Sequence, residues 1–195
     1  MVMVILAYGS PYAWLFWAAV VFAYAPECRL ILRSRPDRGQ AIDRGSTGII
    51  MLAAWIAFPV AFYTAGTGHF RLAPGRLWFA AGIVLLLAGS CLRRYCWRQL
   101  GRYFTGRVMI QEGQTVIDQG PYRWVRHPSY TGGMMMHLGC GLALENWMSA
   151  SILLVTSLLA YLYRVKIEER ALMAGLGESY RLYMRRTKRF VPFVI

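Results

Sequence analysis

The sequence predicts an all-α integral membrane protein with about five transmembrane helices. Hydrophobic residues make up 57% of its 195 residues and charged residues only 16%, well below the share of about 25% that is usual in soluble domains. The apolar residues gather in runs close to the roughly 20 residues that a bilayer requires. The formal net charge of +13 is carried mainly between those runs, as expected for loops beside an anionic membrane surface.

Five apolar runs follow one another along the chain. Three lie in the first half and two shorter ones in the second half: 4–25, 47–64, 77–96, 130–144 and 149–163. We expect helices because a spanning segment must satisfy its backbone hydrogen bonds internally, and no alternating pattern suggests a barrel. The tight connector 145–147 predicts that the last two runs form a helical hairpin.

The basic residues predict the orientation in the membrane. Arginine and lysine concentrate after the first, third and fifth runs, whereas the other two connections carry few. The positive-inside rule therefore places the N-terminus outside and the C-terminus in the cytoplasm. The polar regions 97–128 and 165–195 are then cytoplasmic. The latter is expected to begin as a helix that ends near Gly177, followed by a short helix over 178–186.

This pattern divides the chain into two regions and excludes two kinds of partner, nucleic acid and metal ions. Residues 1–96 form three N-terminal transmembrane helices, and residues 97–195 form a region with its own polar motifs. The bilayer is a sufficient partner for the basic loops, so no nucleic acid is expected. The four cysteines are scattered and lie at no zinc spacing from a histidine, so no metal site is expected.

The first motif is GPYRWVRHPSYTG, residues 120–132. Pro128 directs His127 toward an extended conformation and is tolerated in the first turn of the helix that follows. His127 is therefore expected at the membrane-surface end of the fourth run. Free backbone donors at that helix start could bind an anion. An interfacial turn whose aromatic residues belong to the membrane belt is an equally open reading.

The second motif is Arg164 and Glu168, whose spacing places both side chains on one helix face. They could form a surface ion pair of small energetic value. Because Arg164 ends an apolar run, it lies near the bilayer boundary, where an arginine either extends to the interface or has a functional role.

These motifs together resemble the isoprenylcysteine carboxyl methyltransferase family. The resemblance rests on residues 120–132, on Asn146, and on the tail RVKIEERALMAGLGESYRLYMRRTKRFVPF, and it covers about residues 100–195. It implies a membrane methyltransferase that uses S-adenosylmethionine in a cytoplasmic pocket formed by the C-terminal half. Carried over by motif position, it implies that Arg164 faces the substrate as the catalytic residue. It implies cofactor contacts for Gln114, Thr115, Val116, Ile117, Tyr122, His127, Pro128, Ser129, Tyr130 and Glu168.

The expected reaction is carboxyl O-methylation of a lipophilic, isoprenylcysteine-like acceptor. A carboxylate is ionised at neutral pH, so its methylation needs no general base and depends on positioning and desolvation. Arginine suits this task because it can hold a carboxylate through two hydrogen bonds.

Other functions stay open. Methylation of a phospholipid amine, a small thiol or a phenol fits the same membrane setting, and an amine or phenol would require a base such as His127 or Glu169. A sterol-reductase-like enzyme would bind a nicotinamide cofactor instead. A small non-enzymatic membrane protein would give no reason for the two motifs.

Overall fold

The computed structural model describes residues 6–8, 11–33, 45–106 and 108–191. Within these ranges the secondary structure is helical, with two isolated bridges and no strand. The elements are η1 (Leu6–Tyr8), α1 (Tyr12–Arg33), α2 (Ser46–Gly66), α3 (Gly75–Leu100), η2 (Gly101–Tyr103), η3 (Gly120–Arg123), α4 (Pro128–Ala143), α5 (Trp147–Leu176) and α6 (Glu178–Arg186). The predicted all-α membrane fold is confirmed.

Three of the described helices are long and apolar enough to cross a membrane. They are α2, α3 with the short η2 that follows it, and α5. The α4 helix has only 16 residues, and α1 carries Glu27 and Arg29 in its second half. A total of about five spans therefore stays a prediction. The basic connection at 34–44, with Arg35, Arg38 and Arg44, lies outside the described residues.

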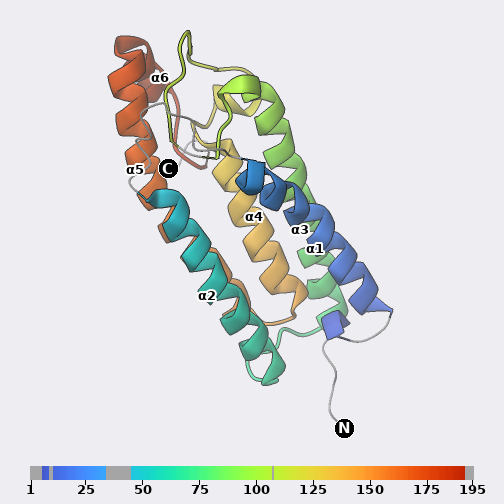
Figure 1. Cartoon of the computed structure of the whole chain (residues 1–195). Coiled ribbons are helices and arrows are strands. Elements are labelled where there is room, and N and C mark those ends of the chain that lie inside the picture. Colours follow the sequence, from blue (N-terminus) through green and yellow to red (C-terminus); the bar gives the residue numbers. More distant parts are fainter. Residues whose placement is uncertain (1–5, 9–10, 34–44, 107, 192–195) are drawn as a thin grey trace.

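The helices α3 and α4 pack in direct backbone contact. A methyl group added at Gly82 would lie 2.3 Å from the backbone nitrogen of Ala143, and one added at Gly139 would lie 2.4 Å from that of Leu86. Small residues permit this approach between membrane helices. The α1 helix packs against α3, and α2 runs along α5 (Figure 1).

The α5 helix continues well beyond the apolar run 149–163. Asn146 caps its start by accepting a hydrogen bond from the Ser149 backbone nitrogen at 2.9 Å. The helix ends at Gly177, whose φ of +58° suits glycine. Arg164 and Glu168 therefore lie within one continuous helix, on the face that the rest of the molecule covers.

A buried polar cluster closes the end of the bundle opposite α6. The Glu145 carboxylate pairs with Arg71 at 2.9 Å. The Asn146 amide donates to the His69 carbonyl at 2.6 Å. These contacts fasten the hairpin of α4 and α5 to the connection between α2 and α3. Asn146 thus has a structural role, far from the other residues of the resemblance.

Candidate active site

A cavity of about 410 Å³ lies between α1, α2, α4 and α5, within the range of about 300–1,000 Å³ that small-molecule sites occupy. One part of its wall is polar and is formed by α5, by the start of α4 and by the segment before it. The other part is apolar and is formed mainly by α1 and α2. The apolar part includes Cys28, Ile50, Met51, Ala54, Trp55 and Phe58.

The structure brings the predicted site residues to this one cavity, with a single exception. Arg164 lines it, as do Gln114, Thr115, Val116, Ile117, Tyr122, His127, Ser129, Tyr130 and Glu168. Pro128 is not among the described lining residues; it is buried in the first turn of α4. Contact with a cofactor stays a prediction for each of these residues.

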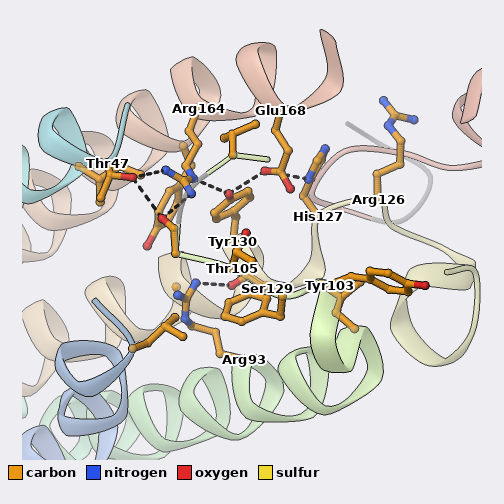
Figure 2. A pocket seen from close by; sticks show the side chains of 18 of the residues that line it. Thr47, Arg93, Tyr103, Thr105, Arg126, His127, Ser129, Tyr130, Arg164 and Glu168 are labelled. Atoms are coloured by element: carbon orange, nitrogen blue, oxygen red, sulfur yellow. Dashed lines mark hydrogen bonds and ion pairs between the residues drawn. The ribbon is translucent and has the colours of Figure 1, made fainter. Parts of the chain in front are cut away.

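Arg164 is the most extensively anchored of them. Its side chain is 6% exposed. Its Nη1 donates to Ser46 Oγ at 3.1 Å and to Thr47 Oγ1 at 2.8 Å. Its Nη2 donates to the Gly106 carbonyl at 2.9 Å, and its Nε donates to the Tyr130 hydroxyl at 2.8 Å. Three separate parts of the chain thus fix the guanidinium against the cavity (Figure 2).

Tyr130 connects the two charged residues of α5. Its hydroxyl accepts from Arg164 and donates to Glu168 Oε2 at 2.7 Å. In Figure 2 the side chains of Arg164 and Glu168 project from α5 toward Tyr130, which rises from α4. The Glu168 side chain is 30% exposed, so its carboxylate remains accessible to a ligand.

His127 is held rigidly at the start of α4. Its backbone nitrogen donates to the Arg189 carbonyl at 3.0 Å. Its ring lies close to Tyr130, with 5.7 Å between the ring centroids. The Nδ1 atom is 4.0 Å from Glu168 Oε2, and Nε2 is 3.4 Å from Glu169 Oε1. His127 therefore presents an edge to each of the two neighbouring carboxylates.

Glu169 has a different environment from Glu168. It is buried and pairs with Arg126 Nε at 3.0 Å and with Arg189 Nη2 at 2.8 Å. The hydrogen bonds that Arg189 donates to Glu169 raise the pKa of the Arg189 guanidinium. Glu169 is not among the described residues that line the cavity. It joins the segment before α4 to the tail, which makes it a poor choice for the base that an amine acceptor would require.

One wall of the cavity is a strap, defined as residues 104–106 and 108–117, that carries Gln114 to Ile117. The Tyr103 hydroxyl donates to the Gly113 carbonyl at 2.8 Å, and Gln111 Nε2 donates to the Arg102 carbonyl at 2.8 Å. Val108 packs in an apolar cluster with Ile167 and Ala171 of α5. These contacts hold the strap across the cavity without regular secondary structure.

The sequence did not indicate two polar groups of the wall. Arg93 pairs with Glu27 through both carboxylate oxygens, with Nη2 2.6 Å from Oε2, and its Nη1 donates to the Ser129 carbonyl at 2.9 Å. From α2, Thr47 lines the cavity and contacts Arg164. The buried Ser46 also contacts Arg164 but is not among the described lining residues. Glu27 and Arg93 are 66 residues apart in the chain, so no local spacing signals their contact.

The residues of this chain that match known proteins include most of the residues that line the cavity. Residues 82–174 match the family described as the isoprenylcysteine carboxyl methyltransferase (ICMT) family. The protein-S-isoprenylcysteine O-methyltransferase of Rattus norvegicus is 30% identical over 117 residues, which cover 59% of this chain and 41% of that protein. Protein-S-isoprenylcysteine O-methyltransferase B of Arabidopsis thaliana is 31% identical over 115 residues, which cover 58% of each. The chain thus spans about half the length of these curated relatives.

A solved structure shares the fold. It is described as the eukaryotic intramembrane Ras methyltransferase ICMT, without a monobody. The two superpose with a TM-score of 0.65 at 20% identity, over 92% of this chain and 65% of the other. The likeness extends over the N-terminal helices, beyond the residues that the family match covers.

Proposed function

Residues 82–174 match the isoprenylcysteine carboxyl methyltransferase family, and on this basis we propose that the chain transfers a methyl group from S-adenosylmethionine to the carboxylate of a lipophilic, isoprenylcysteine-like acceptor. The observation that carries this proposal is the buried Arg164 guanidinium, which lies on the wall of a cavity with a polar part and an apolar part. A lipidated carboxylate needs both an anion-binding group and an apolar wall.

The polar part of the cavity fits the chemical groups of S-adenosylmethionine, namely a sulfonium, an ammonium and a carboxylate. Aromatic rings stabilise nearby cations, and Tyr122 and Tyr130 line the cavity. Burial holds the pKa of Tyr122 well above its usual range, so its phenol stays neutral. Glu168 is accessible for an ammonium or a hydroxyl group, and the start of α4 has backbone donors for a carboxylate. When bound, the cofactor supplies a methyl group on a positively charged sulfur, which becomes a neutral thioether as the acceptor oxygen takes the methyl.

In this proposal, Arg164 orients the carboxylate of the acceptor. Neutral oxygens accept the four hydrogen bonds described above, and these contacts hold the guanidinium in place. An α-carboxyl group has a pKa of about 3.3–3.7, so it reaches Arg164 already ionised. The chain then has no proton to move, and its task is to hold the carboxylate in line and to exclude water.

The apolar part of the cavity accommodates the lipid tail of the acceptor. Met51 and Trp55 of α2 line the cavity and also face outward, and Trp55 is 75% exposed. Cys28 of α1 lies on the same wall. A tail can enter between these two helices from the bilayer. In the orientation that the basic loops favour, the polar part faces the cytoplasm, where the methyl donor is available.

The test is a methyl-transfer assay with purified protein in lipid nanodiscs. Labelled S-adenosylmethionine is offered with a prenylcysteine carboxylate, a phosphatidylethanolamine or a small thiol. We expect label only with the first, in a base-labile ester, at a turnover that is flat between about pH 6 and pH 9 because no base is required. Label in the phospholipid amine, with a rate that rises with pH, would replace this proposal by amine methylation.

A further inference from the structure

Thr47 belongs to the half of the chain that carries no motif of the resemblance. It lies in the first turn of α2, 117 residues before Arg164, and outside the residues 82–174 that match the family. It nevertheless lines the cavity. In Figure 2 it approaches the Arg164 guanidinium from the side opposite to Glu168.

The Thr47 hydroxyl makes two hydrogen bonds of opposite polarity. It accepts from Arg164 Nη1 at 2.8 Å and donates to the Gly106 carbonyl at 3.1 Å. Arg164 Nη2 donates to the same carbonyl at 2.9 Å. These three hydrogen bonds form a closed ring through Arg164, Thr47 and the Gly106 carbonyl. The position of Thr47 in this ring requires a group that both donates and accepts, as a hydroxyl does. The strap, α2 and α5 thus meet at one arginine.

The contacts of Arg164 hold two edges of its guanidinium. Tyr130 holds the Nε side. Thr47 and Ser46 hold Nη1 at the far edge, and the Gly106 carbonyl holds Nη2. Thr47 makes the shorter of the two Nη1 contacts and also binds the Gly106 carbonyl. Anion recognition by arginine depends on the placement of the guanidinium plane, and small displacements of a binding group are costly.

We infer that Thr47 is a positioning residue that holds the Arg164 guanidinium toward the acceptor carboxylate. The inference rests on the proposed function and deepens it, because it assigns to α2 a part in the recognition of the acceptor charge. Thr47 acts through Arg164, so it affects acceptors with a free carboxylate and not their neutral esters.

The experiment compares Thr47→Val, which keeps the shape and removes the hydroxyl, with Thr47→Ser, which keeps the hydroxyl. The matched control is Thr67→Val, an exposed site just beyond the other end of α2. Calorimetry without a methyl donor measures the binding of a prenylcysteine carboxylate and of its methyl ester. Turnover with labelled donor gives kcat and KM for the carboxylate.

We expect Thr47→Val to weaken carboxylate binding on the order of ten-fold or more, as for the loss of a hydrogen bond to a charged group. Ester binding stays within about two-fold of wild type under the same principle, because the ester carries no charge for Arg164 to hold. Thr47→Ser and Thr67→Val behave as wild type. In an Arg164→Ala background, Thr47→Val has no further effect, since its role requires the arginine.

Four results would overturn the inference. Carboxylate binding that is unchanged in Thr47→Val removes the positioning role while leaving the proposed function intact. An equal loss for carboxylate and ester, or a loss that adds to that of Arg164→Ala, makes Thr47 a general structural residue. A wild-type protein that binds both ligands equally refutes the proposed function itself, and this inference with it.

Discussion

The Tyr130 hydroxyl shows how much of the site depends on a single oxygen. It accepts from Arg164 at 2.8 Å and donates to Glu168 at 2.7 Å, so one group aligns the residue proposed for the acceptor with one proposed for the cofactor. The ring itself is a separate part of the cavity wall, close to Tyr161, with 4.8 Å between the centroids.

Tyr130→Phe is expected to lower kcat/KM by about ten- to hundred-fold, because two charged groups each lose a hydrogen-bond partner. The ring remains, so the thermal unfolding midpoint should change little. Tyr163→Phe, on the outward face of α5, is the matched control and should retain full turnover. Full turnover of Tyr130→Phe would mean that Arg164 and Glu168 are aligned without it.

Glu169 is expected to matter for stability. Glu169→Gln leaves the buried Arg126 and the partly exposed Arg189 with a neutral partner, and removal of one member of a buried pair costs about 3 kcal/mol. Denaturant unfolding in detergent measures the loss. Glu178→Gln, at a carboxylate that is 63% exposed, should change the free energy of unfolding by less than about 0.5 kcal/mol. A Glu169→Gln protein that is fully stable yet inactive would assign Glu169 to the chemistry instead.

Local spacing explains which site residues the sequence could indicate. Arg164 and Glu168 are four residues apart on a helix, and His127 precedes a proline, so short stretches of sequence contain their relationship. The contact of Thr47 with Arg164 spans 117 residues, and that of Glu27 with Arg93 spans 66. Such contacts depend on how the helices pack, which no single motif encodes.

At the scale of elements, the antiparallel contact of α3 and α4 sets the position of the site. Because α4 begins at Pro128, its distance from α3 determines where His127 and Tyr130 lie. Gly82 of α3 and Gly139 of α4 permit this contact, and the nearest atoms to a methyl group added at either position are backbone atoms that cannot move aside. The position of the start of α4 therefore depends on residues farther along the helix, such as Gly139.

Gly139→Ala tests this contact. Its new methyl group would lie 2.4 Å from the Leu86 nitrogen, so the helices must separate, at a cost of about 2–3 kcal/mol in unfolding free energy. Gly48→Ala is the control, since nothing lies within 4 Å of the added methyl group and the site is helical. The control should be neutral or slightly more stable. Equal stability of the two variants would show that the α3–α4 contact is looser than described.

The end of α5 near Gly177 was predicted, whereas the joining of the apolar run and the helix after it into one continuous helix was not. The apolar run ends near Tyr163, yet α5 continues to Leu176. Hydropathy indicates where a residue is surrounded by lipid or protein, and it does not indicate where a helix ends. A helix continues until a residue interrupts its backbone. Gly177 supplies that interruption. The start of α4 was predictable for the same reason, because Pro128 limits the backbone directly.

For the whole molecule, the membrane orientation is the open prediction. His69→Cys, in the connection between α2 and α3, should react with an impermeant maleimide from outside intact cells, and Ser179→Cys, at the start of α6, only in inverted vesicles. Both positions are exposed. The parent protein with its own cysteines gives the background. Reversed labelling would place the cavity's polar part on the outer side and contradict a cytoplasmic supply of methyl donor.

The carbonyl of Gly106 has a consequence for the energetics of the complete reaction. It binds Arg164 and Thr47, and it belongs to the same strap that carries Gln114 to Ile117. In the proposed reaction the methyl donor would contact this strap directly, and the acceptor would be held by Arg164, which binds the strap. We therefore expect the two affinities to be thermodynamically coupled: by whatever factor the donor changes the affinity for the acceptor, the acceptor must change the affinity for the donor. Neither ligand would then have a single affinity that holds in the absence and presence of the other.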